Sequence, residues 1–176
     1  YQLDSGALGQ RNRTVVGIGK TFKVAKGLRI DGAFEHSQVY GGPTGDFSVE
    51  AANLGVEWID SDRVKVSGRF EIRYEDHTTE FGRDRLQILL PCSASVKLHR
   101  DVTPLFRIMY GNTTDLEFEA TEAELLELGT GLAYRPVHSD WIAVIVKYTK
   151  RFEQRPIDVA LEVPEREEHD VVSLIP

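Results

Sequence analysis

Apolar and polar residues alternate along most of this chain, and a period of two is typical of β-strands with two different faces. The clearest stretch runs from Val64 to Tyr74. One face carries Val64, Val66, Gly68, Phe70, Ile72 and Tyr74, and the other carries Lys65, Ser67, Arg69, Glu71 and Arg73. A helix would mix these sets on every side. The stretch therefore predicts a strand of about 11 residues, close to the length of a tilted strand that crosses a membrane.

The same alternation recurs in further segments and predicts an all-β chain. The apolar sets of these segments lie within 16–24, 28–34, 54–58, 86–98, 106–110, 126–134 and 142–148. A ninth strand is predicted to begin at Asp170–Ile175, and Tyr1–Leu3 is predicted to end an earlier one. Between 8 and 10 strands are therefore expected, and residues 1–176 are predicted to form a single β-barrel domain or a fragment of a barrel.

Two classes of connection are predicted between these strands. Tight turns, rich in the Gly, Asp, Ser and Pro that turns favour, are predicted at Ala25–Gly27, Asp60–Asp62, His99–Asp101 and Pro136–Asp140. Longer polar loops are predicted at Ser37–Asp46, Glu75–Asp84, Asn112–Thr121 and Arg151–Glu168. Short and long connections alternate without exception. This alternation is expected of an up-and-down barrel, where odd and even connections lie at opposite ends.

Aromatic residues flank the predicted strands in two groups. Trp58, Tyr134 and Trp141 lie beside the tight turns, and Phe34, Tyr74, Tyr110 and Tyr148 lie toward the long-loop ends of their strands. Two aromatic girdles are expected where a barrel meets the two interfaces of a membrane. A soluble ligand-binding barrel has the same periodicity with its apolar face inside, and it remains the alternative.

Composition limits the partners of the chain. The formal net charge is −7, which argues against binding to nucleic acid. The single cysteine, Cys92, excludes an internal disulfide and the usual cysteine-based zinc sites. The longest apolar run, Trp141–Val146, is far shorter than the roughly 20 residues of a membrane-spanning helix. Tyr1–Lys20 lacks the pattern of a signal peptide, so we expect a mature or partial chain if the protein is exported.

Two segments resemble hairpins of Gram-negative outer-membrane β-barrels, namely Leu54–Tyr74 and Leu128–Phe152. Both place aromatic residues around a polar turn that leads into an alternating strand. The matching residues are Trp58, Asp60 and Asp62 in the first, and Tyr134, Arg135, Pro136, Asp140 and Trp141 in the second. The likeness covers roughly residues 14–152. Porins, surface-protein barrels and the barrels of TonB-dependent receptors share such hairpins, so no particular family is indicated.

The resemblance implies an up-and-down antiparallel transmembrane β-barrel in the bacterial outer membrane, with the lipid bilayer as its partner. Four residues depart from the expected pattern. Lys20 falls in the lipid-facing set and predicts either an interfacial position or a bulge, and Pro91 predicts a bulge or kink. Glu122 and Glu124 share the parity of Leu126, and we interpret them as strand above the membrane. The chain stops within a predicted strand, so closure is expected to need further strands from the same or another polypeptide.

Charged residues on the polar face are the candidates for a pore lining. They are Arg29, Glu35, Lys65, Arg69, Glu71, Arg73, Lys97, Arg107 and Lys147. Glu71, flanked by Arg69 and Arg73, is best explained by cross-strand ion pairs that fill a narrow lumen, and ion selection is the alternative. No catalytic motif, cofactor motif or set of metal ligands is evident. The histidines are scattered, although His77 with Asp76 and Glu80, or His169 with its acidic neighbours, are candidates for a weak cation site.

These observations leave several hypotheses. The first is an outer-membrane barrel with a structural or porin-like passive-transport role, alone or within an envelope assembly. The second is a barrel whose long loops, above all Arg151–Glu168, bind a partner protein, a glycan or a cation. A soluble ligand-binding barrel is the third. An enzyme is not expected, because no nucleophile and base fall together near a rim.

Overall fold

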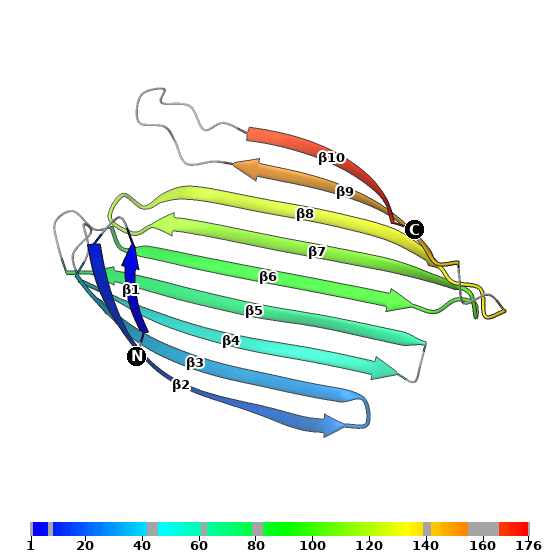
Figure 1. The fold of residues 1–176 in the computed structure, drawn as a ribbon, viewed down its shortest axis with the longest axis horizontal. Coiled ribbons are helices and arrows are strands. Elements are labelled where there is room, and N and C mark those ends of the chain that lie inside the picture. The colour runs from blue at the N-terminus through cyan, green and yellow to red at the C-terminus, as the bar shows by residue number, and fades with distance from the viewer. Residues whose placement is uncertain are drawn as a thin grey trace.

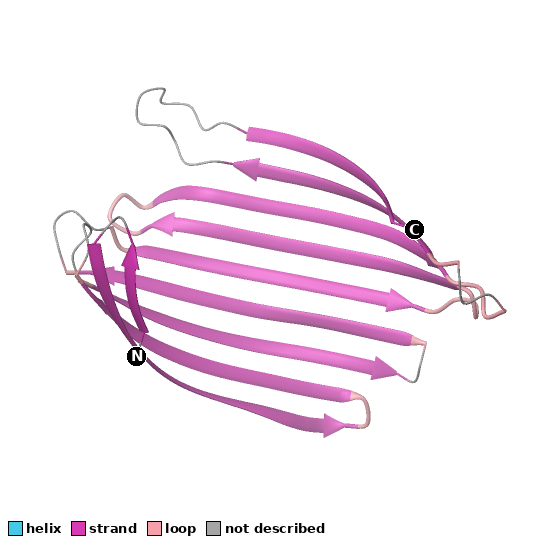
Figure 2. Cartoon of the chain, in the orientation of Figure 1, coloured by secondary structure: helices cyan, strands magenta, loops and turns pink. Residues whose placement is uncertain are grey.

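The computed structural model describes residues 2–6, 9–41, 46–60, 63–78, 83–138, 142–154 and 166–175. These residues form one layer of antiparallel strands (Figures 1 and 2). The strands are β1 (Gln2–Gly6), β2 (Gly9–Ala25), β3 (Leu28–Tyr40), β4 (Phe47–Asp60), β5 (Val64–His77), β6 (Arg85–Val96), β7 (Val102–Asp115), β8 (Ala120–Tyr134), β9 (Val144–Gln154) and β10 (Arg166–Ile175). The described residues contain no helix long and apolar enough to cross a membrane.

The order of strands in the sheet is the order along the chain, from β1 to β10. Every strand therefore pairs with its sequence neighbour, as the alternating hairpins predict, and the all-β, up-and-down antiparallel fold is confirmed. The sheet is open: among the described residues, β10 has no partner on its outer edge. On β2, the partner β1 reaches only as far as Arg13, so the edge from Thr14 to Ala25 is also unpaired.

The two open edges run in the same direction. In Figure 1, β2 and β10 both lead from the end with the longer connections to the end with the tight turns. We call these the loop end and the turn end. Because the strands from β2 to β10 alternate in direction, the first and the last of them are parallel. They cannot pair with each other in an antiparallel sheet.

Strand pairing separates the side chains into the two sets that the periodicity predicts. Across the middle of the sheet, Asp31, Gly55 and Arg69 lie side by side on β3, β4 and β5 and share one face. The residues next to them in sequence, Ile30, Val56 and Gly68, also lie side by side and share the other face. We call these the charged face and the apolar face. Only Val39 and Val49 are buried apolar residues, at 6% and 5% exposure, among the residues whose burial is described. The sheet consequently has almost no core of its own.

The connections differ from the prediction at the loop end, because strand pairing continues beyond the apolar segments. The predicted loop Asn112–Thr121 is mostly strand, and β7 and β8 are joined by residues 116–119 alone. The connection between β6 and β7, residues 97–101, is longer than this although the sequence predicts a tight turn there. The strict alternation of short and long connections is therefore wrong at these two connections, and the predicted turn Pro136–Asp140 lies partly outside the described residues. Thr113 and Thr114 are β-branched and suit extended backbone, and paired strands keep their hydrogen bonds above an apolar band.

Two predicted irregularities have a different form in the structure. The pairing of β2 with β3 is continuous through Lys20, and the register shift lies later, between Lys23 and Ala25. No bulge therefore removes Lys20 from the apolar face. At Pro91 the β5–β6 pairing resumes in the same register after a gap opposite Arg69 and Phe70. Since proline lacks an N–H group, the ladder is interrupted there without a bulge.

Candidate functional site

The apolar face is covered by nothing within the described chain. Ile18 is 77% exposed and Val172 is 73% exposed, and large apolar side chains stay exposed on strands β2 to β10. On β5 the apolar set extends from Val64 to Tyr74. Toward the loop end this set gives way to polar residues, including the pair of His36 Nδ1 and Glu50 Oε1 at 3.7 Å. An apolar band thus crosses the sheet below a polar margin.

The described aromatic residues that the sequence predicts as girdles lie on this face. Two of them lie nearer the middle of their strands than the sequence predicts. Trp58 and Tyr134 lie near the turn end of β4 and β8, and Tyr74 and Tyr110 lie toward the loop end of β5 and β7. Phe34 lies at the middle of β3 because that strand continues to Tyr40, and Tyr148 lies at the middle of β9. Trp141 is outside the described residues.

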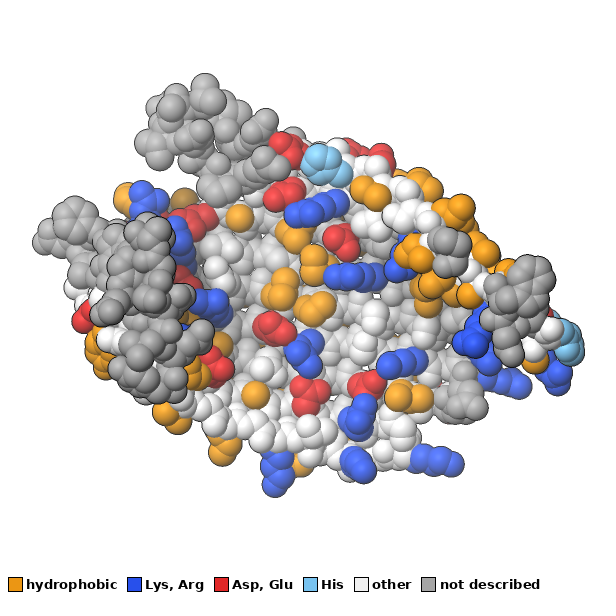
Figure 3. Space-filling model, in the orientation of Figure 1, with side chains coloured by type: hydrophobic (Ala, Val, Ile, Leu, Met, Phe, Trp, Pro, Cys, Tyr) orange, Lys and Arg blue, Asp and Glu red, His pale blue; other side chains and the backbone are white. Residues whose placement is uncertain are grey.

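Charged side chains of both signs are spread over the charged face (Figure 3), and ion pairs join neighbouring strands there. Glu57 pairs with Arg29 on one side and with Lys65 on the other, where Lys65 Nζ lies 3.3 Å from Glu57 Oε1. Arg69 reaches Asp31 at 3.9 Å across the intervening Gly55, whose missing side chain leaves room for both. These contacts connect three neighbouring strands.

Most of the other candidate lumen residues also form ion pairs. Glu35 pairs with Arg13 at 3.1 Å, Arg69 with Glu71 at 3.6 Å, Arg73 with Glu75 at 2.7 Å, and Arg107 with Glu127 at 3.6 Å. Lys97 lies just beyond the end of β6, where its N–H donates to the carbonyl of Arg63. Lys147 has no ion-pair partner among the described residues.

The charged face is hollowed, as the apolar face is beside Trp58. One hollow of about 500 Å³ on the charged face has Asp31, Glu57, Arg69, Glu71 and Arg107 as its charged lining residues. A second, of about 330 Å³, lies beside it over the glycines of β8. Because the hollows are lined mainly by charged, hydroxyl and glycine residues, this face suits water and polar solutes rather than lipid.

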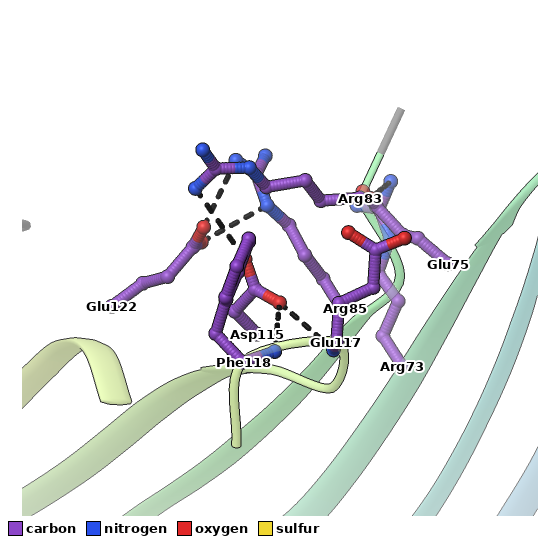
Figure 4. A network of polar contacts seen from close by, with 8 residues as sticks. All are labelled: Arg73, Glu75, Arg83, Arg85, Asp115, Glu117, Phe118 and Glu122. Atoms are coloured by element: carbon purple, nitrogen blue, oxygen red, sulfur yellow. Dashed lines mark hydrogen bonds and ion pairs between the residues drawn. The ribbon is translucent and has the colours of Figure 1, made fainter. Parts of the chain in front are cut away.

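A network of arginines and carboxylates lies at the loop end of β5 to β8 (Figure 4). Asp115 is its centre and is only 1% exposed. Its Oδ1 accepts hydrogen bonds from the N–H groups of Glu117 and Phe118, and Arg83 Nη1 lies 3.4 Å from its Oδ2. Asp115 therefore closes the 116–119 turn and joins it to the residues that precede β6.

A register shift places Glu122 in this network. The shift lies between Thr113 and Thr114, so Glu122 has no partner in the ladder. Its Oε1 accepts a hydrogen bond from Arg85 Nη2 at 3.2 Å, and its Oε2 lies 2.9 Å from Arg85 Nε. The shift takes Glu122 off the face of Leu126 that its parity indicates, whereas Glu124 stays on that face. Only a pairing of β8 with β7 reveals the shift.

The histidines do not gather into one site. His36 faces Glu50, His77 stacks on Phe47 with ring centroids 4.8 Å apart, and His169 Nε2 lies 3.0 Å from Glu167 Oε2. No group of at least three His, Cys, Asp or Glu side chains suited to a metal ion occurs in the described part of the chain. Glu80, one of the predicted cation ligands, is outside that part.

A polar group interrupts the apolar face at β9 and β10. The hydroxyl of Tyr148 donates to Asp170 at 2.7 Å, and Lys150 pairs with Glu168. These contacts pair Lys150, Glu168 and Asp170 with one another or with Tyr148 inside the hairpin. Comparison of the chain with protein-family models, curated protein sequences and solved structures finds no match.

Proposed function

We propose that the chain is part of a closed β-barrel of a Gram-negative outer membrane, with its apolar face against lipid and a structural or passive-transport role. The observation that carries this proposal is the exposed apolar band, which extends from β2 to β10 without a covering element. A protein in water rarely exposes a contiguous apolar patch of more than a few hundred Å². Lipid is the partner that suits so large a surface.

The dimensions of the band support this proposal. From Val64 to Tyr74 the apolar set of β5 spans about 33 Å at a rise of about 3.3 Å per residue. A strand tilt of about 40° reduces this to a height of about 25 Å, the height of the apolar belt of outer-membrane barrels. The charged margin at the loop end then lies at the level of the lipid head groups.

The charged residues on the opposite face support the proposal that the apolar face points outward, toward lipid. In a soluble ligand-binding barrel the apolar side chains fill the interior. Here the hollows contain Asp31, Arg69 and Arg107, which suit an aqueous lumen. Paired charges in that lumen favour a polar interior that small solutes cross, or one that side chains fill.

The barrel closes only if further strands pair with the open edges of β2 and β10. Unpaired backbone groups are costly in a membrane, so the edges of β2 and β10 must both find partners. Because these edges are parallel, an odd number of antiparallel strands has to lie between them. β1 has the required direction and already pairs with the start of β2.

Membrane insertion tests the proposal directly. In a Trp141→Phe variant, Trp58 is the single tryptophan, and it lies on the apolar face. In vesicles with brominated lipid acyl chains we expect strong quenching of its fluorescence, and in detergent-refolded protein we expect heat-modifiable migration on gels. A chain that is monodisperse without detergent and unquenched by brominated lipid contradicts the proposal.

Conductance separates the two roles. Stepwise current increments in a planar bilayer are expected for a passive-transport barrel. Insertion that brominated lipid detects but that carries no current leaves the structural role and excludes open-pore transport.

A further inference from the structure

The smaller hollow on the charged face is bordered by three cations. It has a volume of about 330 Å³, and Lys65, Arg107 and Lys147 line it. They come from β5, β7 and β9, and strand pairing places them in two adjacent rows across the sheet. One row across the sheet contains Lys65, Ser95, Leu105, Gly131 and Lys147, and the next contains Ser93, Arg107, Gly129 and Thr149.

Small residues create the space between these cations. A Cβ atom on Gly131 would lie 3.0 Å from the carbonyl oxygen of Val146 and 3.2 Å from Cγ of Lys147, so a side chain there meets its neighbours. Gly129 leaves the adjoining position open, with Arg107 Cβ 3.5 Å from its ideal Cβ position. The hydroxyl residues Ser93 and Thr149 also line the hollow.

The charges around the hollow do not balance. Glu57 is shared by Arg29 and Lys65, and Glu127 faces Arg107 at 3.6 Å. Lys147 is left without an ion-pair partner among the described residues. Of the charged residues that line the hollow, three are cations and one, Glu127, is a carboxylate, so the excess there is positive although the whole chain has a net charge of −7.

We infer that this hollow binds a small oxyanion of the phosphate class. Arg107 supplies parallel N–H donors that match two oxygens, Lys147 adds a point charge, and hydroxyl groups donate to the remaining oxygens. The inference rests on the proposed function in one respect, since it requires that the charged face meets water. It gives the proposed lumen a substrate class, namely small oxyanions, and a residue, Lys147, on which affinity depends.

Inorganic phosphate is the probe, titrated into the refolded full chain and followed by calorimetry and by ³¹P line broadening. We expect saturable binding that Lys147→Gln weakens about tenfold, the usual loss for a charge-assisted hydrogen bond. Lys147→Arg is expected to retain affinity within about threefold, because the cation is kept. The matched control is Lys23→Gln, which removes a lysine from β2, outside the hollow, and is expected to leave binding unchanged.

A second variant tests the space rather than the charge. Gly129→Val places a side chain in the hollow while its Cβ contacts stay ordinary, so phosphate binding should be lost with normal gel migration. Unchanged affinity in both Lys147→Gln and Gly129→Val, or no saturable binding by the unaltered chain, overturns the inference. Because binding is measured in detergent, it is independent of insertion: phosphate binding without insertion contradicts the proposed function alone, and insertion without binding contradicts this inference alone.

Discussion

Individual residues stabilise this sheet through their side-chain contacts, and Asp115 is the clearest case. Its carboxylate is almost fully buried, accepts two N–H groups of the 116–119 turn and pairs with Arg83. The turn needs this support, because Glu119 within it has a φ of +49°, a backbone conformation that side chains other than glycine rarely adopt. The sequence shows an Asp in a polar segment but no sign of its burial.

We expect Asp115→Ala to lower the free energy of unfolding by about 2 kcal/mol, because two N–H groups and Arg83 lose their acceptor. Urea unfolding in detergent micelles measures the loss. Glu119→Gly should act in the opposite direction, raising stability by up to about 1 kcal/mol through relief of the strained φ. Equal stability of Asp115→Ala and the unaltered chain would show that the carboxylate does not hold the turn.

Lys20 is the second residue whose surroundings decide its effect. It lies on the apolar face between Ile18 and Phe22, and its Nζ lies 5.1 Å from the centre of the Phe22 ring. If this face meets lipid, the charge opposes folding into a bilayer.

Lys20→Leu is expected to stabilise the folded state in lipid vesicles by about 2 kcal/mol, the lower cost of a lysine on the lipid face near the midplane. Lys23→Leu, on the charged face of the same strand, should bring no such gain. Reversible unfolding by guanidinium in vesicles measures both. A gain from Lys23→Leu as large as that from Lys20→Leu would argue against lipid on the apolar face.

At the scale of elements, hairpins determine the order of the strands in the sheet. Two local irregularities change the pairing between neighbouring strands. The register shift in β8 turns Glu122 toward Arg85, and Pro91 interrupts the ladder between β5 and β6. Period-two alternation predicted the existence and direction of the strands. It did not predict these irregularities, since a shift of one residue depends on the partner strand rather than on local sequence.

Replacement of Pro91 should repair the interrupted ladder. Pro91→Thr restores an N–H group opposite Arg69 and supplies a β-branched side chain, so we expect a gain of about 1 kcal/mol in unfolding free energy. Slower amide hydrogen exchange at residues 68–71 would report the repaired pairing. A destabilised variant with faster exchange there would show that the sheet requires the gap.

At the scale of the whole molecule, the parallel course of β2 and β10 decides how a barrel closes. In an antiparallel barrel, β2 and β10 of one chain cannot pair directly. The same holds for β2 of one copy and β10 of another copy inserted in the same orientation. The open edges, and not the faces, are therefore where further strands must bind.

Cysteine pairs test this closure in a Cys92→Ser background. Thr149→Cys with Val171→Cys, which are paired across β9 and β10, should form a disulfide on mild oxidation. Val16→Cys with Val172→Cys, on the two open edges, should not, because another strand lies between them. Migration on non-reducing gels distinguishes the two. Efficient crosslinking of the second pair within one chain would refute the odd number of intervening strands.

The sequence by itself determined the class of fold, the separation of an apolar from a charged face, and the order of the strands, because a period of two is local and hairpins join neighbours. The candidate residues Arg29, Lys65, Arg69 and Arg107 were assigned to one face by parity alone. Tertiary structure decided which charges pair, where strands extend past the apolar band, the buried position of Asp115 and the hollow beside Lys147. These features depend on register between strands distant in sequence, which no local pattern contains.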